Sequence, residues 1–224
     1  MSLFVALCLA TGLLVALLLW GEQRGARPGG RALRCSAKPL ASACFIAAAV
    51  AQGALQHGYG QVLLAGLVLA ALGDVLLSSA RRFFLGGLFA FLAGHLAYAA
   101  AFVVRGVAWP WAALALAPLT LVAGIVGRWL WPHVERSMRL PVVLYIVVIS
   151  AMVALAAGTY GEPGAAVSPG GSVPWTLGAG AAGFFLSDLA VARDRFVRAS
   201  LANRLWGLPL YYAAQLALAA SAAA

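Results

Sequence analysis

Long apolar segments recur along this chain of 224 residues, with few charged residues inside them. A helix of about 20 apolar residues is long enough to cross a hydrocarbon core about 30 Å thick. Eight such segments can be counted, at about 2–20, 39–56, 60–80, 83–104, 108–131, 140–158, 174–192 and 204–223. Because they occupy nearly the whole chain, the sequence predicts an all-α polytopic membrane protein with eight transmembrane helices in a single domain, residues 1–224.

The basic residues are distributed unevenly between the predicted loops. In an alternating eight-span topology only Arg105 lies on one side. The positive-inside rule makes the basic side cytoplasmic and places both termini outside. The net charge of +9 therefore indicates topology and contact with anionic lipid headgroups, and we expect no nucleic-acid partner. The other fourteen of the fifteen Lys and Arg residues are Arg24, Arg27, Arg31, Arg34, Lys38, Arg81, Arg82, Arg128, Arg136, Arg139, Arg193, Arg195, Arg198 and Arg204.

The first apolar segment has no charged region before it and no small-residue cleavage site after it, so we expect a permanent helix. Frequent Ala, Gly and Arg with a single Lys is typical of a GC-rich bacterial genome, and we expect a bacterial inner (plasma) membrane. Cys8 and Cys44 lie within predicted spans, so a disulfide framework is not expected. No Cys or His residues have zinc-site spacing, and we expect neither a metal nor a cofactor.

Two of the six acidic residues, Asp74 and Asp188, lie deep inside apolar segments. A carboxyl group in hydrocarbon costs several kcal/mol unless it is paired or solvated, so such residues are rare and usually functional. Asp74 lies seven residues before Arg81 and Asp188 five before Arg193. At 1.5 Å per residue both lie about 7–10 Å from the cytoplasmic side, which predicts one cavity opening toward the inner leaflet. The alternative is a structural role, in which each aspartate pairs with an Arg or Tyr of a neighbouring helix.

Further polar residues lie on faces of two predicted helices. His95 and Tyr98 share one face of the fourth span, and Tyr211 and Gln215 share one face of the eighth, with Tyr212 alongside. A glutamine in hydrocarbon needs a hydrogen-bonding partner, which a polar cavity provides. These side chains are therefore candidates to line the cavity, although helix packing and interhelical hydrogen bonding are open alternatives for each of them.

The two aspartates also have matching sequence contexts. Each is followed by an Arg seven residues later and by a Tyr twenty-four residues later. Spans three and seven run in the same direction, so a repeat of four plus four helices would be parallel, with its axis along the membrane normal. Such a repeat would bring the two carboxyl groups together. The matching residues are Arg81 and Tyr98 after Asp74, and Arg195 and Tyr212 after Asp188.

Short motifs follow one another along almost the whole chain: Lys38-Pro39, Gly73-Asp74, Gly94-His95 with Tyr98, Tyr145 with Met152, Ser187-Asp188, and Tyr211-Tyr212 with Gln215. In their order and spacing the chain resembles the YhhN-like integral membrane proteins, which include the lysoplasmalogenases, and it departs from none of these landmarks. The resemblance implies hydrolysis of the vinyl ether bond of a lysoplasmalogen. The products would be a fatty aldehyde and glycerophosphoethanolamine or glycerophosphocholine.

Two carboxyl groups suit this chemistry, because protonating the β-carbon of a vinyl ether generates an oxocarbenium ion to which water adds. An apolar site favours the protonated form of a carboxyl group, which then acts as the general acid. A second, ionised carboxylate stabilises the cation and activates water, as in glycosidases. Asp74 and Asp188 are the predicted catalytic pair, and the greater depth of Asp74 slightly favours it as the acid.

The remaining predicted site residues would bind the lysophospholipid substrate within the membrane. His95 and Tyr98 would orient the water or the enol ether oxygen, and Tyr211 and Gln215 would hold polar atoms near the glycerol. Lys38 would meet the phosphate, or else is only a topology-determining charge. Tyr145 and Tyr212 complete the predicted substrate-binding set.

A different functional class also uses intramembrane carboxyl groups. A proton-coupled transporter of small molecules or lipids would employ the aspartates as proton relays. Against it, the chain has no evident broken helix, and both aspartates lie toward one face whereas transporter sites favour the midplane. A purely structural scaffold is a third possibility, and it explains the buried polar residues least well.

Overall fold

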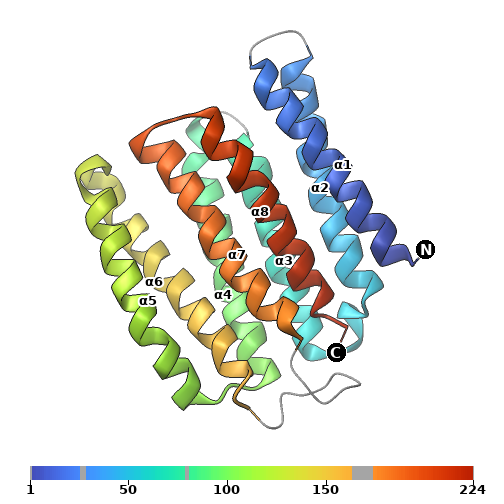
Figure 1. Ribbon diagram of the computed structural model, residues 1–224, viewed down its shortest axis with the longest axis vertical. Coiled ribbons are helices and arrows are strands. Elements are labelled where there is room, and N and C mark those ends of the chain that lie inside the picture. Colours follow the sequence, from blue (N-terminus) through green and yellow to red (C-terminus); the bar gives the residue numbers. More distant parts are fainter. Residues whose placement is uncertain (1, 26–28, 79–80, 163–173, 224) are drawn as a thin grey trace.

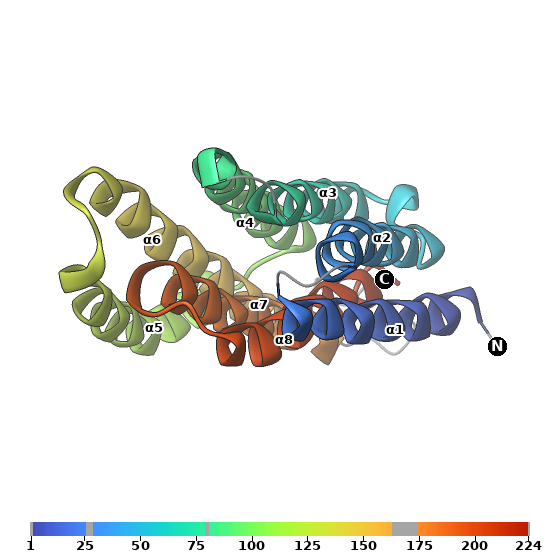
Figure 2. The ribbon, with the colours of Figure 1, turned by 90° about the horizontal axis from the view of Figure 1, so that it is seen from above.

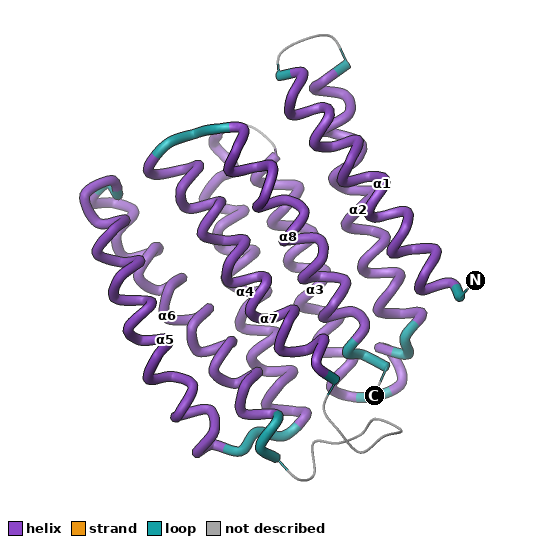
Figure 3. The backbone as a smooth tube through the Cα atoms, in the orientation of Figure 1, coloured by secondary structure: helices purple, strands orange, loops and turns teal. Residues whose placement is uncertain are grey.

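A computed structural model describes residues 2–25, 29–78, 81–162 and 174–223. The regular structure within these ranges is entirely helical, which confirms the all-α class (Figures 1 and 3). Three short 3-10 turns and one π turn join the helices: η1 (Ala54–Gln56), η2 (Arg81–Phe83), η3 (Trp131–His133) and the π turn η4 (Arg193–Val197). The α-helices are α1 (Leu3–Arg24), α2 (Gly30–Ala51), α3 (Gly58–Ser78), α4 (Phe84–Arg105), α5 (Trp109–Leu130), α6 (Arg136–Thr159), α7 (Trp175–Ala192) and α8 (Leu201–Ala220).

Most helix boundaries lie within a few residues of those predicted, but the second helix begins much earlier. We predicted a span over 39–56, with Arg34 and Lys38 in the preceding loop, whereas α2 begins at Gly30 and ends at Ala51. That prediction was wrong, because Pro39 lies inside the helix and does not open it. The helix instead continues through Pro39, as membrane helices can when neighbouring elements accommodate the proline. Lys38 is therefore a helical residue.

Stretches in seven helices, α1 to α7, are long and apolar enough to cross a membrane. α8 is not among them, and it carries the polar residues Asn203, Arg204 and Gln215. The structure thus confirms eight long helices. That all eight span the membrane, with both termini outside, stays a prediction.

Helices α1, α3, α5 and α7 end, and helices α2, α4, α6 and α8 begin, at one end of the bundle (Figure 1). We call this the basic end, because it carries Arg24, Arg82, Arg128 and Arg136 and the residues of η4. The start of α1, the end of α8 and the connections α2–α3 and α4–α5 lie at the opposite end. Arg27, part of the predicted basic pattern, lies outside the described residues, as do the side chains of Arg31 and Arg81.

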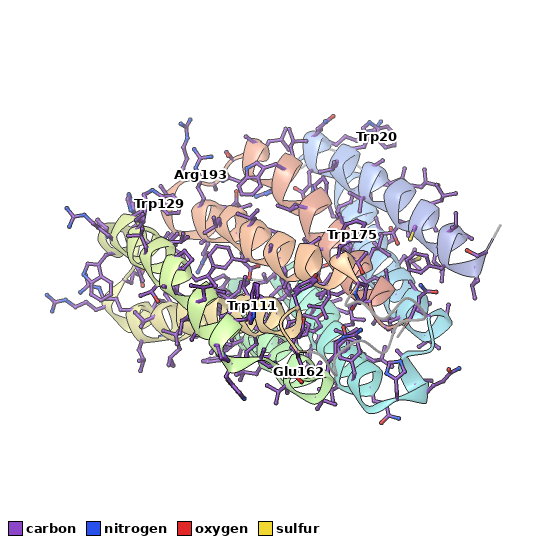
Figure 4. All side chains as sticks on the ribbon, turned by 60° about the horizontal axis from the view of Figure 1, so that its bottom comes forward. Trp20, Trp111, Trp129, Glu162, Trp175 and Arg193 are labelled. Atoms are coloured by element: carbon purple, nitrogen blue, oxygen red, sulfur yellow. The ribbon has the colours of Figure 1, made fainter. Side chains whose placement is uncertain are left out.

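Tryptophan side chains mark both ends of the bundle. All seven are exposed, with exposed fractions between 38% and 75%. Figure 4 shows Trp20 and Trp129 toward the same end as Arg193, and Trp111 and Trp175 toward the end of Glu162. Tryptophan is enriched at membrane–water interfaces, where its ring is half in lipid. The two groups therefore agree with a bilayer between the ends.

Viewed from the basic end, six helices form a closed ring in the order α2, α3, α4, α6, α7, α8 (Figure 2). Helix α1 packs outside this ring on α2 and α8, and α5 packs outside it on α6. The neighbours in the first half (α1–α2, α2–α3, α3–α4) are matched in the second half by α5–α6, α6–α7 and α7–α8. The contact of α4 with α6 is likewise matched by that of α8 with α2. This is the packing expected of the predicted repeat, which itself stays a prediction.

Glycine allows α3 and α4 to approach closely beside the buried aspartate. A Cβ atom at Gly66 would lie 2.4 Å from the ring of Tyr98, and one at Gly73 would lie 2.7 Å from the ring of Phe91. Neither distance is compatible with a side chain there unless the ring moves. Small residues at such positions are how membrane helices pack tightly. Here the close packing of α3 on α4 fixes the position of Asp74, the residue after Gly73, inside the ring of six helices.

Candidate active site

A cleft of about 1070 Å³ opens at the basic end of the bundle and contains both intramembrane aspartates in its lining. Its walls come from α2, α3, α7, η4 and α8, with Glu22 from α1 and Phe84 and Phe91 from α4. The aspartates lie on different helices, α3 and α7, and both reach this one space. The cleft also contains charged side chains near its opening, namely Glu22, Arg34, Asp194, Arg195, Arg198 and Arg204.

Asp74 is surrounded by side chains that stabilise a carboxylate. It is only 3% exposed, and Lys38 Nζ lies 2.8 Å from its Oδ1. Ser42 donates a hydrogen bond to Oδ2 over 3.3 Å, and the hydroxyl of Tyr212 donates a short one to the same atom. A buried charge is tolerated when it is paired and hydrogen-bonded, as this one is. We call these four residues the Asp74 centre.

The early start of α2 builds much of this centre. Lys38 and Ser42 are four residues apart and so lie on the same face of α2. That face meets α3, which carries Asp74, and α8, which carries Tyr212. Had the helix begun after Lys38, as the sequence suggested, the ammonium would have lain in a loop. The ion pair therefore depends on the extra turns at the start of α2.

Asp188 has different neighbours, and none of them is a lysine or arginine among the residues that the structure describes. The hydroxyl of Tyr145 donates a hydrogen bond of 2.6 Å to its Oδ2, and His95 Nε2 lies 3.3 Å from that same atom. The side chain of Asp188 is 13% exposed, whereas that of His95 is 1% exposed. Asp188, Tyr145 and His95 are called the Asp188 centre below.

The backbone holds the other nitrogen of His95. His95 Nδ1 lies 2.6 Å from the carbonyl oxygen of Phe91, which can only accept, so Nδ1 carries the hydrogen. This bond orients the ring so that Nε2 faces the Asp188 carboxyl group. Nε2 is buried and makes no hydrogen bond within the described part of the chain.

A second, narrower space of about 70 Å³ meets the cleft at Asp188. It lies between α4, α5, α6 and α7, and its lining is almost entirely apolar, with Ala123, Val126 and Ile146 among the wall residues. We call it the crevice. Asp188 lines both spaces, the cleft with its several charged side chains and the almost entirely apolar crevice. The other residues common to both are Leu77, Phe84, Phe91, Val191, Arg195 and Phe196.

A chain of ring contacts connects the two centres. The imidazole of His95 stacks on Phe184 with ring centroids 4.3 Å apart. Phe184 meets Tyr211 at 5.5 Å, and Tyr211 meets Tyr212 at 4.9 Å. Phe91 also contacts both Phe184 and Tyr211. Such packing restricts the rotamers of these rings, so both sets of polar groups are held in fixed positions before any ligand binds.

The structure brings most of the predicted site residues to the two carboxyl groups, with two exceptions. Lys38 and Tyr212 contact Asp74, His95 and Tyr145 contact Asp188, and Tyr211 lines the cleft. Tyr98 and Gln215 are fully buried and contact each other, the tyrosine hydroxyl donating to Gln215 Oε1 over 2.6 Å. They are not among the lining residues of the cleft or the crevice.

Ser42 belongs to the Asp74 centre but is not among the residues predicted for the site. Its signal was its position one helical turn after Lys38, which would have been recognised had α2 been extended to Gly30. Among the described residues, no three His, Cys, Asp or Glu side chains are grouped so as to hold a metal ion. The polar groups that contact the two carboxyl groups are an ammonium, an imidazole, two phenol hydroxyls and the Ser42 hydroxyl.

Comparisons with known proteins give a consistent result. The model of the YhhN family matches residues 33–222. The chain is 30% identical over 180 residues to lysoplasmalogenase TMEM86A of Bos taurus, covering 75% of this chain and 71% of that protein. It is 33% identical over 165 residues to lysoplasmalogenase TMEM86B of Homo sapiens, covering 74% of this chain and 65% of that protein. For TMEM86B of Mus musculus the identity is 34% over 161 residues, covering 72% of this chain and 63% of the relative. No solved structure gives a match.

Proposed function

Because this chain belongs to the YhhN family, we propose that it is a membrane-embedded hydrolase that cleaves the vinyl ether bond of a lysoplasmalogen. The products would be a fatty aldehyde and a glycerophosphoethanolamine or glycerophosphocholine. One observation carries the proposal: Asp188 lines both the cleft, with its charged side chains, and the apolar crevice, and a second, differently paired aspartate lines the same cleft. The names of the curated relatives support the reaction class.

The two spaces correspond to the two parts of a lysophospholipid. The polar headgroup would occupy the cleft at the basic end, and the single hydrocarbon chain would enter the crevice. At about 70 Å³ the crevice accommodates only the start of the chain, so the rest would extend into the surrounding lipid. The vinyl ether, which joins chain to glycerol, would then lie at Asp188. By the positive-inside rule, the lipid would enter from the cytoplasmic leaflet of the membrane.

Asp188 is the better candidate for the general acid, which reverses the slight preference for Asp74 drawn from depth. The ammonium of Lys38, 2.8 Å away, gives Asp74 a fixed counter-ion. Asp188 has no such fixed cation among its described neighbours, and its partners are the Tyr145 hydroxyl and the His95 imidazole. In the first step its O–H proton would form the new C–H bond at the β-carbon of the vinyl ether. The carboxylate left behind would stabilise the oxocarbenium ion, and Tyr145 would stabilise that carboxylate.

Asp74 would act on the water. An ionised carboxylate offers about four lone-pair positions. Three donors, Lys38, Ser42 and Tyr212, already contact this one, which leaves about one position for a water in the cleft. That water would add to the cation and give its proton to Asp74. As the hemiacetal collapses, its hydroxyl proton would return to Asp188 and the Asp74 proton would pass to the departing glycerol oxygen. Both carboxyl groups would then be restored.

The transporter alternative is not favoured, because the curated relatives are hydrolases by name. The decisive test is aldehyde release by the purified protein in detergent, without any gradient, from a pure 1-alkenyl lysophosphoethanolamine. We expect stoichiometric fatty aldehyde and glycerophosphoethanolamine, identified by mass spectrometry. The saturated 1-alkyl analogue, which has no vinyl group, should remain intact. Absence of aldehyde from a folded, monodisperse sample would refute the proposed function.

A further inference from the structure

Five basic side chains line the cleft, and three of them are engaged with acidic groups. Lys38 pairs with Asp74. Arg34 and Arg204 both contact Glu22, at 3.9 Å and 2.6 Å, and Arg204 also lies 3.5 Å from an Asp194 oxygen. The remaining two, Arg195 and Arg198, have no carboxylate partner in the described part of the chain. The cleft therefore holds two positive charges that are not neutralised from within.

Arg195 is the better placed of the two, because it lines the crevice as well as the cleft. Its guanidinium carbon lies 4.1 Å from the centroid of the Phe84 ring. An arginine stacked on an aromatic face keeps its N–H groups free at the edge, in the fork geometry that matches a phosphate. The stacking thus fixes the guanidinium without using its hydrogen-bonding capacity.

The backbone that carries Arg195 is also held in place. It belongs to the π turn η4, which the bond from Arg198 N to Arg193 O closes over 2.8 Å. The next residue back, Asp194, accepts hydrogen bonds from Ser200 N and Asn203 Nδ2, at 2.9 Å and 3.1 Å. Turns of this kind are rare and are frequent at functional sites. Arg195 therefore projects from an anchored turn.

The spacing from the catalytic carboxyl group suits a glycerophosphate. Arg195 follows Asp188 by seven residues, which is about 10 Å along a helix axis. In a lysoplasmalogen the vinyl ether and the phosphate are attached to opposite ends of the three-carbon glycerol. With the vinyl ether at Asp188, the phosphate would lie toward the basic end, within reach of a long arginine side chain.

We propose that Arg195 binds the phosphate of the lysolipid, with Arg198 as a secondary contact, and that this contact selects phosphate-bearing lipids over neutral ones. The inference rests on the proposed function, since it places the same lipid in the same cleft. It adds a specificity-determining residue, and it predicts that uncharged 1-alkenylglycerols are excluded.

The test measures binding and needs no turnover. Two saturated ether lipids, 1-alkyl lysophosphocholine and 1-alkylglycerol, are titrated into the purified protein in a neutral detergent. We expect the wild type to prefer the phosphate-bearing lipid by at least about tenfold, the difference that a charge-assisted hydrogen bond supplies. Arg195→Gln should lose that preference while binding 1-alkylglycerol as before. Arg195→Lys, which keeps the charge but not the fork, should fall between them.

The matched control is Arg136→Gln, which removes an exposed arginine at the same end that lines neither space. It should bind both lipids as the wild type does. Equal affinity of the wild type for the two lipids would overturn the inference, as would an Arg195→Gln variant that retains the preference or loses affinity for both lipids alike. Because the saturated lipids are not cleaved, a failure here is distinguishable from absence of aldehyde release, which would refute the proposed function instead.

Discussion

The Asp74 and Asp188 centres occupy matching places in the bundle but surround their carboxyl groups differently. Asp74 is contacted from α2 and from α8, and Asp188 from α6 and from α4. In a four-plus-four repeat these are equivalent helices. One centre nevertheless contains a lysine at 2.8 Å, and the other contains a histidine at 3.3 Å. Matching places in the bundle therefore surround the two carboxyl groups with different neighbours, and the proposed division into acid and base rests on those neighbours.

The largest effect is expected at Asp188. Asp188→Asn removes the proton donor but preserves the size of the side chain, and its amide can still contact Tyr145 and His95. A positioned general acid contributes about 10²–10⁴ in rate, and we expect kcat to fall by that amount with little change in thermal stability. Steady-state aldehyde release and a melting curve provide the two readings. Near-normal turnover would show that Asp188 is not the acid.

Unlike Asp188→Asn, Asp74→Asn should also destabilise the fold, because it leaves the Lys38 ammonium buried without its counter-ion. Breaking a buried pair in this way costs about 3–5 kcal/mol of stability. We expect a marked drop in melting temperature together with a loss of turnover of about 10²-fold. Adding Lys38→Met should restore the melting temperature without restoring activity. If the single variant were as stable as Asp188→Asn, the contrast between the two centres would be wrong.

Removing the phenol hydroxyl from each centre should lower kcat by a smaller factor than removing the carboxyl groups. Tyr145→Phe removes the only hydroxyl group that donates a hydrogen bond to Asp188 in the described part of the chain. After Tyr212→Phe, by contrast, Asp74 still accepts hydrogen bonds from Lys38 and Ser42. A hydrogen bond to a charged group contributes about 1.5–3 kcal/mol, so we expect Tyr145→Phe to lower kcat at least about tenfold. Tyr212→Phe should lower it less. The reverse order in kcat would assign the charged intermediate to the Asp74 centre.

The smallest effect is expected from filling the crevice, which adjoins only the Asp188 centre. Ala123→Phe would project a ring into this space of about 70 Å³. We expect KM for a long-chain substrate to rise severalfold, while a substrate with a very short chain is unaffected. Ala117→Phe, on an exposed part of the same helix, is the control. Equal effects on both chain lengths would place the alkyl chain elsewhere.

Apolar length and charge distribution were sufficient to predict eight helices and a basic end. Helical rise predicted that Asp74 and Asp188 lie at a similar depth and reach one cavity, because rise depends only on residue number. The early start of α2 was hidden by Pro39, whose local preference is overridden by packing in a bundle.

The partners of the carboxyl groups were harder to predict, because they depend on how each helix is rotated about its axis. Tyr98 and Gln215, on the same predicted faces as His95 and Tyr211, contact each other instead of the cleft. The pairing of Lys38 with Asp74 joins residues 36 positions apart and has no local signal. Depth favoured Asp74 as the acid, whereas its buried cation favours the opposite assignment.

The central claim is that the Asp188 carboxyl group protonates carbon in a vinyl ether. Its most direct test is aldehyde release from a pure 1-alkenyl lysophosphoethanolamine in D₂O, followed by mass spectrometry of the trapped aldehyde. We predict that the wild type yields aldehyde with one deuterium on the carbon next to the carbonyl group, and that Asp188→Asn yields it at least about 10²-fold more slowly. Aldehyde without that deuterium, or undiminished release by Asp188→Asn, would contradict the account.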